Sequence, residues 1–424
     1  MMSKLLMVML LTSFALGAAV AQLSVKETVY QKSPAFTVES PFYRAVLLPD
    51  KGGRILELID KKNGKNLVYD NGYGGLLDDH AGRLRKKYSI RWLKRSEREV
   101  IVEVRLDDAE SYTKKITFNA DSPVIRVDYH VENYNQQPLR LLFRNVLRPG
   151  GAAFTGRELY CQSREPGRKF RQYPGDCQTQ RMVSPWGCLV DPVDKTAIGM
   201  AFEGDNLVHL YAWRASELAP TFEFVCDQLP EGKSVDFTCY WFIGHGLAEV
   251  DYAARDQLVA LPGSYDGGKL ALQLKVDPLV PELRRLDAAV QILDPQRKEL
   301  ALVKPTSLRF QAVDHVEETG MELPLNKHPY VIARVTLASD ASAVPQVFEK
   351  VFPLNGQEAL VKDYQVPTVR IGKALYRELP DWRKEEKYRL QITEADKRRG
   401  YLVFAEFGPG KGTHAPELTF ALGL

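Results

Sequence analysis

Residues 207–213 carry side chains whose types and spacing suit the recognition of a sugar. Alternate residues of an extended strand share one face, which places Leu207, His209, Tyr211 and Trp213 together. Aromatic rings stack on the apolar C–H faces of sugars, and an imidazole beside them can exchange a proton. A half-buried stripe of the core gives the same pattern. The segment therefore indicates either an aromatic platform or an ordinary core strand.

Arg144 and Asn145 offer hydrogen-bond donors for hydroxyl or carboxylate groups. Arg144 cannot serve as a proton donor at neutral pH, because the pKa of a guanidinium exceeds about 12. A binding role is open to both residues. With His209 as a base, they could also neutralise the carboxylate of a uronate, as a polysaccharide lyase requires.

Asp78, Asp79 and His80 follow one another in a turn-rich segment. Carboxylates and imidazole can hold a cation, but three adjacent side chains cannot all converge on one metal without ligands from elsewhere. We therefore expect no metal site here, and nothing in the sequence calls for another cofactor.

Basic residues concentrate in two segments, one after His80 and one around Cys161 and Cys177. They are Arg83, Arg85, Lys86 and Lys87 in the first, and Arg164, Arg168, Lys169, Arg171 and Arg181 in the second. If both border one binding face, that face favours acidic sugars such as uronates or sulfated units. A solvated basic surface explains the same clusters. The whole chain has a formal net charge of only +3, so we expect no nucleic-acid partner.

The elements that must position these residues are strands. Short alternating runs, separated by turns such as Asp50-Lys51-Gly52-Gly53, fill most of the chain. Only residues 248–261 and 381–386 have a helical pattern. Strands without interleaved helices favour antiparallel sheets packed face to face, and argue against a Rossmann domain or a (β/α) barrel. The sequence therefore predicts an all-β protein.

The first residues have the pattern of an export signal. Lys4 gives the N-terminal region a positive charge, and an apolar run follows it. Ala19-Val20-Ala21 has the small-x-small pattern of a cleavage site. We expect cleavage after Ala21 and a periplasmic or secreted protein. No other stretch is apolar for long enough to form a transmembrane segment.

The length of 424 residues suggests two or three domains, at roughly 150 residues per domain. The clearest linker is the segment from Pro262 to Gly268. The strands after it have the number and size expected of an immunoglobulin-like β-sandwich. The predicted parts are a signal peptide at 1–21, a large β-domain at 22–262, an immunoglobulin-like sandwich at 269–356 and a β-rich extension at 357–424.

Export makes the cysteines informative, because thiols outside the cytosol tend to oxidise. Cys161 and Cys177 bracket an irregular loop that a disulfide would stabilise by about 3 kcal/mol, and we predict that they are paired. Cys188 is then left over as a small core residue.

Whether Cys226 and Cys239 can form a disulfide depends on how their strands are connected. Two alternating runs flank turn-like residues around Gly232-Lys233, which predicts a hairpin with Cys226 directly opposite Cys239. That spacing is short enough for a disulfide. Two buried, reduced thiols fit the sequence equally well.

Three stretches resemble motifs of the galactose mutarotase-like superfamily. The opening strand and turn of that family are similar to Gly52–Leu58 and Lys61–Val68, and one of its later turns is similar to Val131–Leu139. Its late Glu strand and following turn resemble Glu223 with Leu229–Lys233. The resemblance covers about residues 24 to 262. It implies a β-supersandwich whose concave face binds sugars, a scaffold used by aldose 1-epimerases, polysaccharide lyases and accessory domains of glycoside hydrolases.

The resemblance also implies roles for particular residues. Glu223 matches the general base of an epimerase, and Arg54 belongs to the opening motif. The family places substrate contacts in the loop that holds Asp78 and His80. The family's acid, a His in an H-x-Y-F-N strand, has no counterpart here, because the corresponding strand reads Phe143-Arg144-Asn145.

Two classes of function follow from these observations. The first is an exported carbohydrate-binding protein or accessory protein of glycan degradation. Its partner would be an oligosaccharide or polysaccharide, and its immunoglobulin-like part would act as a spacer or dock to other glycan-degrading proteins. The alternative is an enzyme, either an epimerase or a lyase, that uses Glu223 with His209 or His80. The candidate binding residues are Arg54, Asp78, His80, Arg144, Asn145, Tyr211 and Trp213.

Overall fold

The computed structural model describes most of the chain between residues 22 and 423. The described residues are 22–69, 74–79, 86–108, 110–151, 158–160, 170–171, 178–181, 185–204, 207–214, 220–325, 328–354, 376–379, 402–406 and 419–423. Within them, every element is a strand except one short 3-10 turn, η1 (Pro49–Lys51). The prediction of an all-β protein is confirmed.

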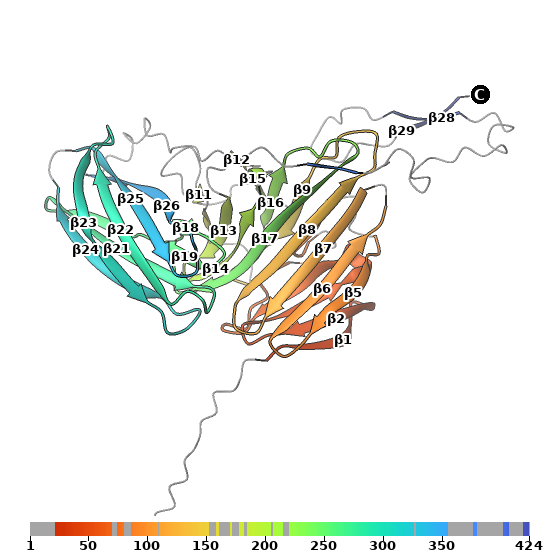
Figure 1. The fold of residues 1–424 in the computed structure, drawn as a ribbon, viewed down its shortest axis with the longest axis horizontal. Helices are drawn as coiled ribbons and strands as arrows, with labels where there is room; N and C mark the ends of the chain where they lie inside the picture. The colour runs from red at the N-terminus through yellow and green to blue at the C-terminus, as the bar shows by residue number, and fades with distance from the viewer. Residues whose placement is uncertain are drawn as a thin grey trace, which may run out of the picture.

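Two antiparallel sheets, built mainly from residues 24–245, face each other (Figure 1). The smaller has the strand order β1 (Ser24–Tyr30), β2 (Ser33–Glu39), β3 (Tyr43–Leu48) and β4 (Arg54–Asp60). The main path of the ten-stranded sheet runs β11 (Phe170–Arg171), β10 (Glu158–Tyr160), β13 (Trp186–Asp191), β14 (Thr196–Glu203), β17 (Lys233–His245), β8 (Val124–Asn133), β7 (Glu110–Asn119), β6 (Glu99–Leu106) and β5 (Ser89–Arg95), and β27 (Arg377–Glu378) pairs with β17.

A third sheet carries the candidate site. Its order is β12 (Gln178–Arg181), β15 (Leu207–Arg214), β16 (Pro220–Cys226) and β9 (Leu142–Val146). We call these three sheets together the first sandwich. Their inward side chains form one apolar core, in which Phe143 and Phe224 stack with ring centroids 4.8 Å apart. Alternation explains the packing, as in β6, whose residues are in turn part-exposed and buried along most of its length.

A second pair of sheets, the second sandwich, is built from the later residues. One sheet has the order β18 (Tyr252–Ala253), β19 (Gln257–Ala260), β21 (Lys269–Pro278) and β20 (Gly263–Asp266), with β24 (Glu317–Pro324) also paired with β21. The other has the order β23 (Glu299–Arg309), β22 (Arg285–Leu293), β25 (Tyr330–Ser339) and β26 (Gln346–Pro353). A separate apolar core, with Leu272 and Val335 among its members, is formed by residues of both sheets.

Two expectations about this part of the chain are wrong. Residues 248–261 form the short strands β18 and β19 instead of a helix. The expected linker contains a strand as well, because β20 pairs with β21 from Gly263 to Asp266. The domain boundaries and the immunoglobulin-like character of residues 269–356 remain predictions. The last strands described are β28 (Leu402–Glu406) and β29 (Thr419–Gly423), which pair with each other.

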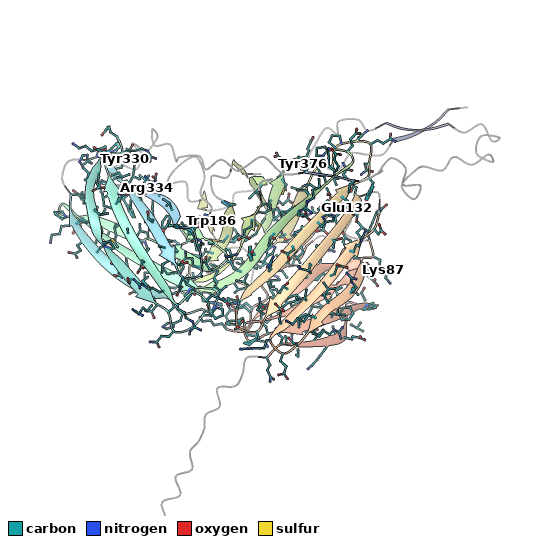
Figure 2. The ribbon with its side chains drawn as sticks, viewed as in Figure 1. Lys87, Glu132, Trp186, Tyr330, Arg334 and Tyr376 are labelled. Atoms are coloured by element: carbon teal, nitrogen blue, oxygen red, sulfur yellow. The ribbon has the colours of Figure 1, made fainter. Side chains whose placement is uncertain are left out.

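The two sandwiches meet through a small apolar cluster of their own. Trp186 of β13 contacts Tyr252 of β18 edge to face at 6.3 Å, and Tyr252 stacks on Phe348 of β26 at 5.6 Å. Leu258 and Leu279 belong to the same cluster as Trp186. Trp186 is labelled in Figure 2. In Figure 1, β14 and β17 lie between the strands β5–β8 and the second sandwich.

The hairpin expected around Gly232-Lys233 is wrong. β16 pairs with β15 and β9, whereas β17 pairs with β14 and β8, so Cys226 and Cys239 lie in different sheets. Both are free and buried, as is Cys188, for which a core position was expected. Cys161 and Cys177 lie outside the described residues, as do residues 1–21 and 381–386. None of the described residues forms a helix long and apolar enough to cross a membrane.

Candidate functional site

Four residues lie in one row across the third sheet. Glu223 of β16 is opposite Arg144 of β9 on one side and opposite Tyr211 of β15 on the other. Beyond β9, Asp78 forms an isolated bridge with Arg144. Residues directly opposite each other in antiparallel strands share a face of the sheet. The fold therefore brings Asp78, Arg144, Glu223 and Tyr211 together from segments far apart in the sequence.

This row lies on the face of the sheet opposite the core. Phe143, Phe222 and Phe224 belong to the core cluster of the first sandwich. Arg144 and Glu223 alternate with them along β9 and β16, so their side chains leave the other face. We call this the outer face of the site sheet.

Asp78 fixes the position of the Arg144 side chain. Its Oδ2 accepts hydrogen bonds from both Nε and Nη2 of Arg144, each at 3.2 Å. Asp78 is only 2% exposed, while the Arg144 side chain is 18% exposed. Burial raises the pKa of Asp78 to about 6, although the charges of Arg144 and Arg54 oppose that shift. The buried Asp78 carboxylate therefore orients the guanidinium of Arg144 before a ligand binds.

Glu223 lies beside this guanidinium and is itself 6% exposed. Burial raises its pKa to about 7 against the opposing charge of Arg144, and the charge of Asp78 raises it further. Arg140 also opposes the shift. A carboxyl group that titrates near neutral pH can donate or accept a proton under ordinary conditions.

Arg54 and Asn145 were both predicted to bind substrate. In this structure they are buried, and their side chains form hydrogen bonds with backbone groups of the protein. Arg54 donates from Nε to the carbonyl of Lys51 at 2.6 Å and from Nη1 to the carbonyl of Gly74. Asn145 accepts from the backbone N–H of Leu77 at 2.8 Å and donates to the carbonyl of Phe222 at 3.2 Å. Both therefore support the segment that carries Asp78.

A buried ion pair beneath the site was missed by the sequence analysis. Lys114 of β7 is fully buried, with its Nζ 2.8 Å from Oδ2 of Asp79. It also donates to the carbonyls of Gly52 and Leu77, and the hydroxyl of Tyr88 donates to Asp79 at 2.9 Å. Burial lowers the pKa of Lys114, although Asp79 opposes that shift. A signal was present, because a Lys at 114 occupies a core-facing position in an alternating strand.

The aromatic candidates lie on β15, next to Glu223. Tyr211 is opposite Glu223, Trp213 is opposite Thr221, and His209 is opposite Val225. Their side chains lie outside what the structure describes. Leu207 was expected on the same face, but a register shift separates it from His209, and Leu207 belongs to the core.

His80 and most of the basic residues around Cys161 and Cys177 also lie outside the described residues. No group of His, Cys, Asp and Glu side chains within the described part of the chain is arranged to hold a metal ion. Among the described side chains of the outer face, Arg144 offers a positive charge and hydrogen-bond donors, and Glu223 offers hydrogen bonding and proton exchange.

Comparison with known proteins gives weak likenesses of structure. No family model and no curated protein matches the sequence. A galactose mutarotase-like protein from Clostridium acetobutylicum is 11% identical, with a TM-score of 0.40 over 53% of this chain and 99% of that one. A galactose mutarotase-like protein from Lactobacillus casei is 12% identical, with a TM-score of 0.37 over 49% of this chain and 99% of that one.

A further likeness is to a 4-alpha-glucanotransferase from Thermococcus litoralis. It is 12% identical, with a TM-score of 0.35 over 52% of this chain and 39% of that one. Each of these similarities covers about half of the chain, and none assigns it an activity.

Proposed function

We propose that this protein binds carbohydrate through the outer face of the site sheet, centred on Arg144 and Glu223. The observation that carries the proposal is the row in which buried Asp78 holds the Arg144 guanidinium beside Glu223. A fixed pair of N–H donors next to a carboxyl group suits the adjacent hydroxyls of a sugar ring.

The neighbouring positions support the same ligand class. Tyr211 and Trp213 occupy register positions on β15 that share the outer face with Glu223. Aromatic side chains beside polar donors form a typical sugar site, with the rings against the C–H face and the polar groups on the hydroxyls. The motifs around Arg54, Asn133 and Glu223 resemble a sugar-binding family, which points in the same direction.

The preferred ligand in this proposal is an acidic sugar. Arg144 supplies a guanidinium that can pair with a carboxylate or sulfate, and the charge of Arg140 acts on the same carboxyl group, Glu223. The ionised form of Glu223 would oppose such a ligand, so binding of an anion is expected to favour protonated Glu223. The protein would act outside the cytoplasm, as its predicted signal peptide requires, and its second sandwich would serve as a spacer or docking element.

A second candidate function, catalysis, is favoured by the pKa of Glu223, which lies at about 7. That value suits a general base in an epimerase or a lyase acting on acidic polysaccharide. The acid partner would be His209, which lies on β15 close to Glu223 in register, or His80.

Glu223→Gln separates the two functions. A binding protein keeps most of its affinity, because the amide still forms hydrogen bonds. An enzyme that needs the base loses about 100-fold or more of its turnover. Binding would be measured on a glycan array and by calorimetric titration, and turnover by sugar anomerisation and by the appearance of unsaturated uronates.

A further inference from the structure

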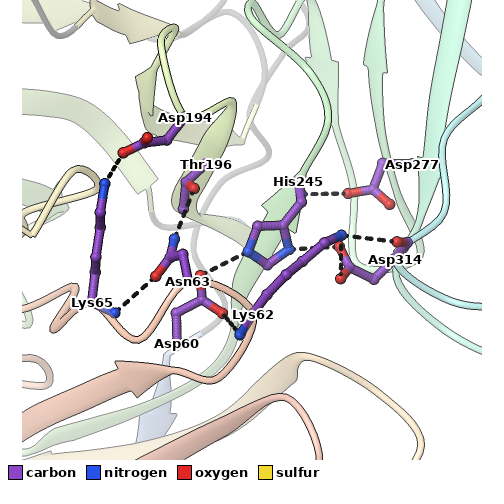
Figure 3. Close-up of polar contacts among 9 residues, drawn as sticks. All are labelled: Asp60, Lys62, Asn63, Lys65, Asp194, Thr196, His245, Asp277 and Asp314. Carbon is purple, nitrogen blue, oxygen red and sulfur yellow. Dashed lines mark hydrogen bonds and ion pairs between the residues drawn. The ribbon is translucent and has the colours of Figure 1, made fainter.

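His245, the last residue of β17, lies where the first sandwich meets the second (Figure 3). Its Nε2 is 2.8 Å from Oδ2 of Asp60, at the end of β4 in the first sandwich. Its Nδ1 is 2.7 Å from Oδ1 of Asp314, in the segment between β23 and β24 of the second sandwich. One imidazole ring therefore connects carboxylates of both sandwiches, and His245 is only 9% exposed.

These two contacts require a charged ring. A carboxylate oxygen only accepts hydrogen bonds, whereas a neutral imidazole has a single N–H and can serve only one of the two carboxylates. The imidazolium form donates from both nitrogens and satisfies both. The geometry of His245, Asp60 and Asp314 is thus that of one cation shared between two anions.

Other charged groups lie near His245 at this junction. Lys62 places its Nζ 3.0 Å from Oδ2 of Asp314, and Lys61, which lines the adjacent pocket of about 170 Å³, pairs with Glu39 at 2.7 Å. Asp277 of β21 accepts the backbone N–H of His245 at 3.0 Å. Burial raises the pKa of Asp277 well above its usual value, which favours its neutral form.

The pKa of His245 agrees with the geometry. Burial disfavours the charged ring, but hydrogen bonds to Asp314 and Asp60 outweigh that effect and raise the pKa to about 9. The ring is therefore protonated at neutral pH and loses its proton only in alkaline solution.

Two glycines let the sandwiches approach each other at this point. A Cβ on Gly244 would lie 2.3 Å from Cδ1 of Leu258 and 2.9 Å from Oδ2 of Asp277. A Cβ on Gly246, whose φ is +86°, would lie 2.7 Å from Cγ2 of Val316. Side chains on either side of His245 would therefore push the second sandwich away.

We propose that protonated His245 couples the two sandwiches into one cooperative unit, and that loss of its proton loosens the second sandwich from the first. After deprotonation, Asp60 and Asp314 face each other's charge across a neutral ring, with Lys62 as the remaining cation in contact with Asp314. Breaking a buried ion pair from one side leaves uncompensated charge, which is strongly destabilising. The proposal concerns the junction alone and does not depend on sugar binding.

The direction of the pH effect follows from the pKa. The folded-state value is about 9, above the usual 6.5, so the stabilisation is complete below about pH 6.5 and is lost as the pH rises through about 9. Acidification to neutral pH therefore favours the coupled state.

The test combines NMR of ¹⁵N-histidine-labelled mature protein with calorimetric unfolding. At about pH 7, His245 should show two ring N–H signals, one of which is lost with a midpoint near pH 9 as the ring becomes neutral. Asp314→Asn should lower that midpoint by about one unit or more, because it removes one of the two charges that stabilise the imidazolium. A single ring N–H at about pH 7, or an unchanged midpoint in Asp314→Asn, would overturn the proposal.

Unfolding tests the coupling itself. Wild-type protein should unfold in one transition at about pH 7, and at about pH 10 the transition should split or fall by about 5 °C or more. His245→Gln should behave at about pH 7 as the wild type does at about pH 10, with little further change on alkalinisation. His130→Gln is the matched control, because His130 also contacts a carboxylate, Asp236 at 2.7 Å, but lies on the exposed face of β8.

The pH series keeps the test valid if His245→Gln does not fold. A wild-type protein whose transition stays single and unshifted from about pH 7 to about pH 10 would contradict the coupling. So would a folded His245→Gln variant that matches the wild type at both pH values.

Discussion

Arg144 and Asp78 are joined twice, once through their main chains and once through their side chains. The backbone N–H of Arg144 donates to the carbonyl of Asp78 at 2.9 Å, and the reverse bond measures 3.3 Å. The guanidinium of Arg144 also donates two hydrogen bonds to the Asp78 carboxylate. The place of the guanidinium on the outer face is therefore set by a residue that a ligand cannot reach.

Asp78→Asn should weaken oligosaccharide binding without unfolding the protein. The amide keeps the size of the side chain but removes the charge that orients Arg144, so we expect about 10-fold weaker binding, the usual effect of losing one charge-assisted contact. Calorimetric titration would measure the change. Asp128→Asn is the control, because Asp128 pairs with Arg126 at 2.8 Å on a different, solvated face. Equal affinities for Asp78→Asn and wild type would show that the orientation of Arg144 does not matter.

Glu223 should make the protein less stable as the pH rises. Its folded-state pKa of about 7 exceeds the usual 4.5, so the folded protein binds this proton more tightly than the unfolded chain does. Stability from this group is then lost between about pH 4.5 and 7. Glu223→Gln should match the wild type at about pH 4.5 and exceed it by about 1–3 kcal/mol at about pH 8.

Urea unfolding at both pH values would test this prediction. Glu103→Gln, a surface change on β6 at a residue that pairs with Arg91, is the matched control. A Glu223→Gln variant that is less stable than the wild type at the higher pH would show that the carboxylate is favourable where it lies.

Binding of an acidic oligosaccharide should weaken as Glu223 ionises. Above about pH 7 the row holds two carboxylates for one guanidinium, and a third anion is repelled. We expect about a 10-fold loss of affinity between about pH 6 and 8, with little change for a neutral oligosaccharide of the same length. Glu223→Gln should remove the part of this dependence that lies around pH 7, whereas ionisation of Asp78, whose pKa is about 6, remains. A wild-type affinity for the acidic ligand that is constant over this range would exclude a role for Glu223 in anion recognition.

Lys114→Met should destabilise the protein strongly, by about 3–5 kcal/mol, because it leaves the Asp79 carboxylate buried without its cation. Lys114→Met combined with Asp79→Asn should recover part of this loss, since no buried charge is then uncompensated. Lys115→Met, on the same strand but with a half-exposed side chain, is the control and should change stability by less than about 0.5 kcal/mol. Urea unfolding measures all three, and a mild effect of Lys114→Met would mean that Asp79 finds another partner.

Local alternation was sufficient to predict many of the strands. The alternating runs of the sequence at 100–106, 112–119 and 124–133 correspond closely to β6, β7 and β8, because the period of two is a property of each segment alone. Partner choice is not local. The turn-like residues around Gly232 connect β16 and β17, which belong to different sheets. A turn between two alternating strands has the same sequence pattern whether the strands pair with each other or join different sheets.

The site was predictable in its residue types but not in its geometry. Arg144 and Glu223 were identified from their chemistry and from the resemblance, yet their adjacency depends on the pairing of β9 with β16. The burial of Asn145 and Arg54 depends in part on hydrogen bonds with backbone groups distant in the sequence, at Gly74 for Arg54 and at Leu77 and Phe222 for Asn145. His245 gave no signal at all, because its partners Asp60 and Asp314 are far from it in the chain.

The most direct test of the proposed sugar site is a calorimetric titration of acidic and neutral oligosaccharides into the mature protein and its Arg144→Gln variant. We expect saturable binding by the wild type and a loss of affinity of about 10-fold or more in Arg144→Gln. Arg126→Gln, which removes another arginine paired with an aspartate but on a different face, should bind as the wild type does. No binding by the wild type across a broad set of glycans, or equal affinity of Arg144→Gln, would contradict the proposed sugar site.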